Sequence, residues 1–189
     1  MIQLPRARNR RKLLAIIGLA FALILMTGFT SAVYVLNSPS LLRRATAWWI
    51  GAQYLGTNGV LMQTQANNCG PASLKMIFDH YGIPSTVDGL DTDAELTYKR
   101  TSMLTLKEMA EKRGLGAEGW RYTMDDFMHL KMPAIVFVRG DHFAVADSVT
   151  SDGFIILSDP AVGKVKIAAN NFQRIWKGET LVFKKRSKN

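Results

Sequence analysis

The 189-residue sequence predicts an α+β domain preceded by one transmembrane helix. Residues 13–36 are apolar and carry no charge, and a helix of this length can cross a bilayer. Apolar residues then recur at helical spacing between residues 69 and 131, whereas β-rich runs separated by turn residues follow from Pro133. Helices followed by antiparallel strands are typical of an α+β domain.

The basic side chains are concentrated before the predicted domain. Of the 24 basic residues, seven lie in residues 1–57, where there is no acidic residue, which leaves 17 basic and 15 acidic side chains in the rest. The formal net charge of +9 therefore belongs mostly to the N-terminal segment, and the domain is close to neutral. Because nucleic-acid binding requires a concentrated basic surface, the sequence predicts no nucleic-acid partner.

Residues 13–36 are expected to anchor the chain as a single span in the inner (cell) membrane of a bacterium. Five cationic side chains precede this run, and only Arg43 and Arg44 follow it closely. The positive-inside bias therefore predicts that residues 1–12 are cytoplasmic and that the domain is periplasmic or extracellular. A cleaved signal peptide is the alternative, since residues 30–32 (Thr-Ser-Ala) form a small-residue cleavage site, but the length of the run favours a retained anchor.

Residues 37–57 are expected to form an amphipathic linker helix, followed by the domain over residues 58–189. Turn-forming residues open the linker, and a mixed basic and aromatic stretch follows. Trp48, Trp49 and Tyr54 could lie at the membrane interface, where amphipathic rings are favoured, or could pack on the domain. The sequence leaves both interpretations open.

The only cysteine, Cys69, lies near the predicted start of a helix that ends at Gly82. Asn67 and Asn68 are cap-type residues, and the Gly-Pro pair after the cysteine suits a first helical turn. The unpaired amides at a helix N-terminus favour a thiolate, which is the nucleophilic form of cysteine. A small buried core residue is the other interpretation, and this stretch alone favours it. One cysteine forms no internal disulfide, so an oxidising compartment would leave a free thiol or an intermolecular bridge.

Of the three histidines, His142 is the one expected to serve Cys69 as a base. His80 lies eleven residues along the same helix, about 16 Å from the cysteine at roughly 1.5 Å per residue. His129 falls in a predicted short helix, where a partly buried structural histidine is expected. His142 opens a strand after a Gly-Asp turn, and from this edge position an imidazole can face a helix N-terminus.

A carboxylate that orients His142 should lie on a neighbouring strand. Asp159 ends the strand that returns after the predicted hairpin and is the expected neighbour of the histidine. Asp141 and Asp147 are alternatives, although Asp141 would point to the opposite face and Asp147 would face solvent.

Two glutamines precede the cysteine and are candidates for binding an oxyanion. Gln63 and Gln65 lie six and four residues before Cys69. A side-chain amide together with the backbone amide of Cys69 could stabilise a developing negative oxygen. Either glutamine could equally be a surface residue, and spacing alone does not choose between them.

These motifs together resemble the bacteriocin-processing (double-glycine) peptidases, family thirty-nine of the cysteine peptidases, which have a papain-like fold. The resemblance covers roughly residues 60–185. It rests on Gln63, the run Cys-Gly-Pro-Ala-Ser-Leu from Cys69, the run His-Phe-Ala-Val from His142, and Asp159-Pro160 with Gly163.

The resemblance implies one role for each of four residues. Cys69 would be the nucleophile, His142 the general base and then acid, Asp159 the orienting residue, and Gln63 the oxyanion donor. Many family members are cytosolic modules fused to an exporting transporter, where they cut leader peptides after Gly-Gly. An anchored domain outside the cytoplasm differs from that arrangement, so the resemblance implies peptide-bond hydrolysis more strongly than it implies leader removal.

The sequence therefore predicts a membrane-anchored cysteine peptidase that cuts a peptide or protein substrate, at a Gly-Gly or small-residue site. A catalytically idle domain that binds or assembles a membrane protein complex is the alternative. Acyl or amide transfer by the same residues is a third hypothesis, which the sequence does not separate from hydrolysis. Neither metal-ligand spacing nor a phosphate-binding or dinucleotide-binding glycine loop occurs in the sequence, so no metal and no cofactor are expected.

Overall fold

The computed structural model describes residues 6–94 and 101–185, with side chains from residue 12 onward. The chain divides into two compact units, Met1–Leu42 and Arg43–Asn189, and the second unit is the domain.

Helix α1 (Arg6–Leu36) belongs to the first unit, and from Leu13 onward it carries no charged residue on any face. Its segment Lys12–Leu36 is long and apolar enough to cross a membrane, judged by length and composition. The side chains of this segment are not buried against the protein. A retained membrane span and a signal sequence both have these properties, because both place an apolar helix in lipid.

Helix α2 (Pro39–Trp49) crosses the boundary between the two units, and its last turns belong to the domain. The chain then turns and enters strand β1 (Ala52–Gly56). One helix was expected over residues 37–57, so the strand is a difference between sequence and structure. The strand forms because its backbone pairs antiparallel with β6 (Gly163–Ala168), a contact between segments more than 100 residues apart.

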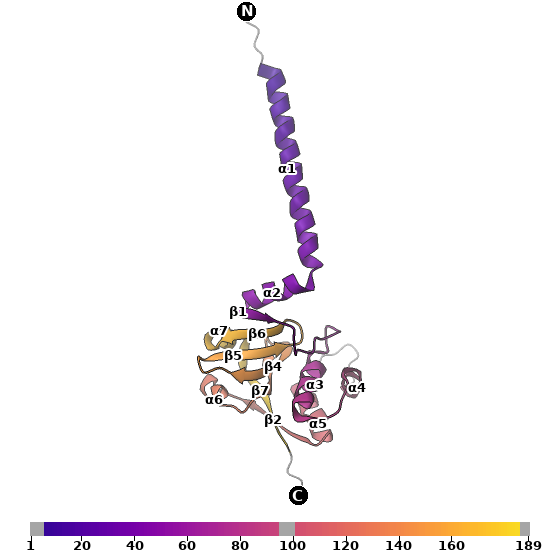
Figure 1. Ribbon diagram of the computed structural model, residues 1–189, viewed down its shortest axis with the longest axis vertical. Helices are drawn as coiled ribbons and strands as arrows, with labels where there is room; N and C mark the ends of the chain where they lie inside the picture. The colour runs from indigo at the N-terminus through magenta and orange to yellow at the C-terminus, as the bar shows by residue number, and fades with distance from the viewer. Residues whose placement is uncertain (1–5, 95–100, 186–189) are drawn as a thin grey trace, which may run out of the picture. The chain divides into compact units, whose positions relative to one another are not determined.

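In the described part of the chain, seven strands form one antiparallel sheet in the order β1-β6-β5-β4-β3-β7-β2 (Figure 1). The confirmed α+β fold therefore has β1 at one edge of the sheet and β2 at the other. The remaining strands are β2 (Leu115–Arg121), β3 (Ala134–Val138), β4 (His142–Val149), β5 (Phe154–Asp159) and β7 (Trp176–Lys185).

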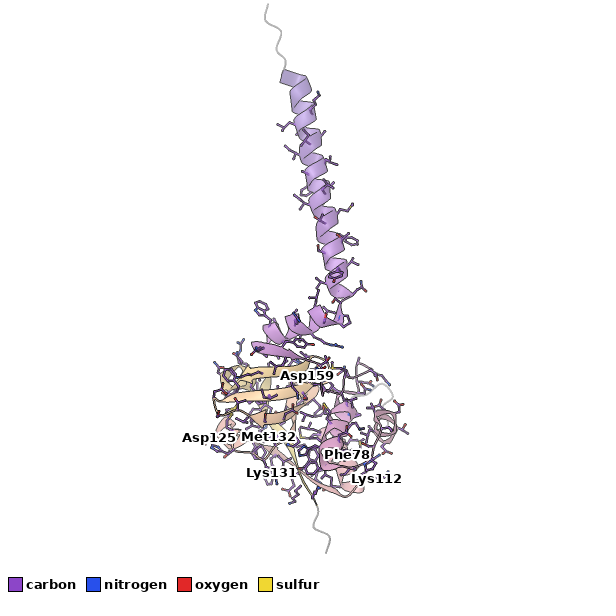
Figure 2. The ribbon with its side chains drawn as sticks, viewed as in Figure 1. Phe78, Lys112, Asp125, Lys131, Met132 and Asp159 are labelled. Carbon is purple, nitrogen blue, oxygen red and sulfur yellow. The ribbon has the colours of Figure 1, made fainter. Side chains whose placement is uncertain are left out.

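Both faces of the sheet are covered, because alternate strand residues are apolar on each face. Ile135, Val145 and Leu181 pack with the core of the helices α3, α4 and α5, whereas Val136 and Ala144 pack with α6 and α7. Figure 2 shows Phe78 among the first group of helices. The helices are α3 (Cys69–Tyr81), α4 (Val87–Asp93), α5 (Met103–Lys112), α6 (Met124–Met128) and α7 (Ala169–Ile175).

Strand β2 and helix α7 were not expected from the sequence. The β2 sequence Leu-Gly-Ala-Glu-Gly-Trp-Arg contains two glycines and a glutamate, which are depleted in strands. The strand forms through a seven-residue register with β7, from Leu115↔Lys185 to Arg121↔Glu179. Tertiary pairing therefore overrides the weak local preference of this segment.

Candidate active site

Cys69 is the first residue of α3 and is 2% exposed. The helix ends at Gly82 in a left-handed conformation, so the expected helix over this stretch is confirmed. A Cβ added at Gly70 would lie 3.2 Å from Cβ of Thr101 and 3.4 Å from Cδ2 of Phe143. The glycine thus lets the start of α3 approach β4 closely, which brings the cysteine to the end of the sheet.

Asn68 is fully buried before the cysteine and holds the loop that leads into α3. It occupies the expected N-cap position, but its side chain does not cap the helix. Its Oδ1 accepts from the backbone amide of Gln65 (3.2 Å), and its Nδ2 donates to Thr64 Oγ1 (3.2 Å) and Asp91 Oδ2 (3.1 Å). Asn68 therefore ties the loop before Cys69 to helix α4, a function that a cap-type residue in a sequence does not reveal.

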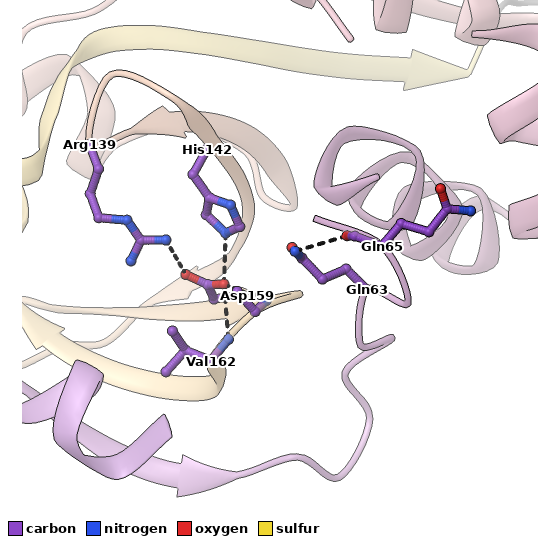
Figure 3. Close-up of polar contacts among 7 residues, drawn as sticks. Gln63, Gln65, Arg139, His142, Asp159 and Val162 are labelled. Carbon is purple, nitrogen blue, oxygen red and sulfur yellow. Dashed lines mark hydrogen bonds and ion pairs between the residues drawn. The ribbon is translucent and has the colours of Figure 1, made fainter. Parts of the chain in front are cut away.

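His142 and Asp159 come together at the end of the sheet, as the hairpin argument predicted. Strands β4 and β5 pair antiparallel, with Val145 opposite Ser158. His142 Nε2 lies 2.8 Å from Asp159 Oδ1, and both side chains are buried (Figure 3). His142 also lies close enough to Cys69 for each side chain to shift the pKa of the other, so the imidazole stands between the carboxylate and the sulfur.

The carboxylate of Asp159 is held by several donors besides the histidine. Its Oδ1 accepts from the backbone amides of Ala161 (2.8 Å) and Val162 (3.1 Å), which belong to the turn between β5 and β6. The turn continues into Gly163, whose φ is +110°. A Cβ at that position would lie 2.5 Å from the carbonyl oxygen of Gly56, so this turn requires glycine.

Arg139 contacts the other oxygen of the same carboxylate and was not among the expected site residues. Its Nη2 lies 3.5 Å from Asp159 Oδ2 (Figure 3). Arg139 has a φ of +57°, and its backbone amide donates to the carbonyl of Ile175 at 2.6 Å. The only signal in the sequence was a basic residue in the turn before His142, and the spacing gave no reason to orient it toward Asp159.

The three central side chains shift one another's pKa values. Burial raises the pKa of Cys69, but the hydrogen bond and charge of His142, with two backbone hydrogen bonds, outweigh it and lower the pKa below its ordinary value. Burial lowers the pKa of His142, yet hydrogen bonds and charges from Asp159 and Cys69 raise this pKa to about 9. Burial raises the pKa of Asp159, but His142 and Arg139 lower it overall. The group therefore favours thiolate, imidazolium and carboxylate together.

Gln63 lies beside this group, because its backbone amide donates to the carbonyl of Pro160 at 2.8 Å. Its side-chain Nε2 donates to the backbone carbonyl of Gln65 at 3.1 Å (Figure 3). Within residues 12–94 and 101–185, its buried Oε1 has no hydrogen-bond partner. The side chain of Gln65 is exposed, so the two glutamines occupy different environments.

The other candidate histidines and carboxylates lie elsewhere. His80 is near the far end of α3, with its ring edge-on to Tyr81. His129 is exposed and bonded to the carbonyl of Asp125, so the expected partial burial was wrong, because the short helix α6 ends just before it. Asp147 accepts from Ser158 Oγ at 2.7 Å and pairs with a lysine. Asp141 is exposed in the turn before His142.

A small cavity of about 160 Å³ opens beside the cysteine. Its lining includes Thr101, Phe137 and Phe143, and the buried hydroxyl of Thr101 has no hydrogen-bond partner among the described side chains. Among the described residues, no group of three His, Cys, Asp or Glu side chains could hold a metal ion.

A cysteine at the start of a helix, facing a histidine on an antiparallel sheet, defines the class of papain-like cysteine peptidase domains. Residues 57–188 match the Peptidase C39 family. The chain belongs to this family of cysteine peptidases, and the resemblance found in the sequence is confirmed.

Two relatives illustrate the range of proteins that share the domain. An uncharacterized protein of Methanothermobacter thermautotrophicus is 33% identical over 131 residues, which cover 68% of this chain and 89% of the relative. FapD of Pseudomonas aeruginosa, described as a probable functional amyloid protease, is 34% identical over 122 residues, which cover 59% of this chain. The match spans only 54% of FapD.

Among solved structures, the domain is similar to a double glycine motif protease from an AMS/PCAT transporter, determined in complex with the leader peptide. The TM-score is 0.64 at 27% identity, and the match covers 71% of this chain and 99% of that one. The fold of the domain is therefore that of a double-glycine peptidase.

Proposed function

We propose that this chain is a membrane-anchored peptidase in which Cys69, His142 and Asp159 form a catalytic triad. The observation that carries the proposal is the position of the His142 ring, which bonds to the Asp159 carboxylate at 2.8 Å and lies close enough to Cys69 to lower the pKa of its thiol. The lowered pKa of Cys69 and the raised pKa of His142, about 9, support a reactive ion pair at neutral pH.

In the first half of the reaction, the Cys69 thiolate attacks the carbonyl carbon of the scissile peptide bond. A carbon–sulfur bond forms, and the carbonyl electrons move to the oxygen, which becomes negative. His142 then donates its proton to the leaving nitrogen, so the carbon–nitrogen bond breaks and a thioester remains. Asp159 keeps the ring oriented and stabilises its positive charge.

In the second half, His142 is neutral and accepts a proton from water, which attacks the thioester carbon. The carbon–sulfur bond breaks, the new carboxylic acid leaves, and Cys69 and His142 return to the ion pair. An amine in place of water would give amide transfer by the same residues, so the acceptor alone separates hydrolysis from transfer.

Gln63 is the proposed oxyanion donor, together with the backbone amide of Cys69. Its location beside Pro160 and the buried, unpartnered state of its Oε1 in the described structure support a side chain that changes partner when substrate binds. A turn of the side-chain amide would free Nε2 from the Gln65 carbonyl for the substrate oxygen.

The proposed substrates are peptides or proteins cut after Gly-Gly or another small residue. The small volume beside Cys69 supports this choice, as does the similarity to a double glycine motif protease. The proposed organisation keeps residues 1–12 in the cytoplasm, α1 as a retained span, residues 37–57 as the linker and residues 58–189 as the peptidase domain in the periplasm or outside the cell.

The test compares peptides released in the cell envelope by the full chain and by its Cys69→Ala variant. We expect the wild type to generate new peptide ends that follow small residues, and the variant to generate none of them. Equal membrane levels and equal melting temperatures of the two proteins are the control, with His129→Ala as a matched exposed-histidine variant. Identical peptides from both proteins would contradict catalysis by Cys69, and an unchanged cellular phenotype with Cys69→Ala would favour an assembly role instead.

A further inference from the structure

Two neighbouring tryptophans at the end of α2 project away from the domain. Trp48 is 80% exposed and Trp49 is 75% exposed. Ala47 on the same helix is fully buried, and Ile50, the residue after the helix, is 7% exposed. Both belong to the core cluster on the α7 side of the sheet. One face of this segment is thus fixed to the domain, while the opposite face presents two indole rings to the surroundings.

The third aromatic residue of this segment behaves differently. Tyr54 is half-buried and packs against the sheet core, and the guanidinium of Arg44 lies 5.8 Å from its ring centroid. Of the two interpretations left open for the aromatic residues, packing on the domain therefore applies to Tyr54 but not to the tryptophan pair.

Chain connectivity places the tryptophan pair near any membrane that α1 crosses. The apolar segment of α1 ends at Leu36, and α2 begins at Pro39. Three extended residue steps and nine helical ones allow Trp48 to lie at most about 24 Å from the end of the span. The headgroup layer begins where the hydrocarbon core ends, so the tryptophan side chains can reach it well within this distance.

The charge around the pair fits a membrane surface. Arg44 precedes Trp48 by four residues, so the two side chains lie on the same side of the helix. Residues 1–57 contain no acidic side chain that would be repelled by anionic lipid. Indole rings favour the headgroup region because one edge is apolar and the N–H is polar, and arginine side chains favour the phosphate layer.

We propose that Trp48 and Trp49 dock the peptidase domain on the surface of the membrane that α1 crosses, with the exposed Arg44 against its anionic headgroups. This inference rests on the proposed retention of α1 as a membrane anchor. A docked domain does not tumble freely on its linker.

The test uses the full chain reconstituted in vesicles of phosphatidylcholine and phosphatidylglycerol, with or without bromine atoms on the acyl chains near the headgroups. Bromine quenches tryptophan fluorescence on contact. Trp120 is the matched control, because it is 57% exposed on β2, at the edge of the sheet opposite β1. Trp176 is buried and serves as an internal reference.

We expect brominated lipid to quench the wild type and Trp120→Ser alike, and to leave the Trp48→Ser/Trp49→Ser variant unquenched. Flotation with the vesicles and cleavage of a soluble peptide are measured on the same samples. If the wild type floats with the vesicles but is not quenched, the docking proposal is wrong and the membrane anchor is retained. If the wild type does not float, both the docking and the anchor are contradicted. A dimer that the double substitution converts to monomer, without bromine quenching, would identify the pair as a protein interface and overturn the proposal. Peptide cleavage tests the catalytic proposal independently of these outcomes.

Discussion

The candidate site has a sheet side and a helical side, and the two are held differently. On the sheet side, each oxygen of the Asp159 carboxylate has partners: Oδ1 accepts from His142 and two backbone amides, and Oδ2 faces Arg139. On the helical side, Oε1 of Gln63 and Oγ1 of Thr101 are buried and have no hydrogen-bond partner among the residues that the structure describes.

This difference suggests separate roles for the two sides: one orients the His142 ring, and the other binds the substrate. A buried polar atom without a partner costs about 1–3 kcal/mol, so a substrate that supplies the partner gains this free energy on binding. In the proposed mechanism, the sheet side, whose carboxylate oxygens already have partners, would orient His142 before a substrate binds. The helical side would offer its unpartnered polar atoms to a bound peptide, so substitutions on the two sides should alter different kinetic parameters.

The largest effect on peptide cleavage is expected from removing the Cys69 sulfur, because the proposed roles of both sides depend on it. Cys69→Ala should lower peptide cleavage by about 10⁵-fold or more, because the covalent step is lost. Cleavage of a Gly-Gly peptide by the full chain measures this effect, with Cys69→Ser to separate loss of nucleophilicity from loss of packing. Residual cleavage near the wild-type rate would show that another residue performs the reaction.

Asp159→Asn should impair the sheet side alone, because it removes the carboxylate charge beside His142. We expect kcat/KM to fall by about 10²–10⁴-fold, because the asparagine does not stabilise the imidazolium. Asp159 helps to raise the pKa of His142 to about 9, so its removal should move the alkaline limb of Cys69 alkylation by iodoacetamide to lower pH. Cys69 is the only cysteine in the chain, so the alkylation rate reports on this thiol directly.

The matched control for this variant is Asp147→Asn. The Asp147 carboxylate is bonded to Ser158 and Lys164, so its neutralisation should leave the alkaline limb in place. An equal shift of the alkylation profile in both variants would mean that general charge, and not the bond to His142, sets the pKa of the histidine.

Gln63→Ala should impair the helical side without altering the ion pair. The expected loss in kcat is about 10²–10³-fold, since an oxyanion donor acts in the transition state. The alkylation profile of Cys69 should stay as in the wild type, because alkylation forms no oxyanion. Gln65→Ala is the control, because only its backbone carbonyl contacts Gln63, and an equal loss of kcat in both variants would contradict the assignment.

Arg139→Gln should have the smallest effect, because Arg139 contacts only one oxygen of the Asp159 carboxylate. The ion pair with Asp159 is long, at 3.5 Å, and the carboxylate keeps its bonds to His142 and two backbone amides without it, so the expected loss is about fivefold in rate, or about 1 kcal/mol. Because Arg139 lowers the pKa of Asp159, its removal should move the acid limb of the pH profile to higher pH and leave the alkaline limb unchanged. The exposed pair of Arg121 with Glu179 provides a control, Arg121→Gln, that should change neither limb.

Much of the site could be predicted because its residues carry local signals. A cysteine after two asparagines and before Gly-Pro predicted a helix start, and a strand opening at His142 predicted a hairpin that returns to Asp159. Both predictions depend on turn chemistry and periodicity, which are properties of short segments.

Other features could not be predicted, because they depend on segments far apart in the chain. Strand β1 forms by pairing with β6, and β2 forms by pairing with β7, against a weak local preference. Arg139 reaches Asp159 only because the turns that end β3 and β5 meet at the same end of the sheet. The bonds of Asn68 to Thr64 and Asp91 likewise require the packing of α4 beside α3.

The amino-acid sequence alone shows which chemistry is available: one thiol, three histidines of which one opens a strand, and an apolar run long enough to cross a bilayer. The folded domain determines which groups meet: Gln63 Nε2 donates to the Gln65 carbonyl, and Tyr54 packs on the domain while Trp48 and Trp49 do not. Short-range preferences set each helix and strand, whereas the packing of both sheet faces selects which distant side chains come within hydrogen-bond distance.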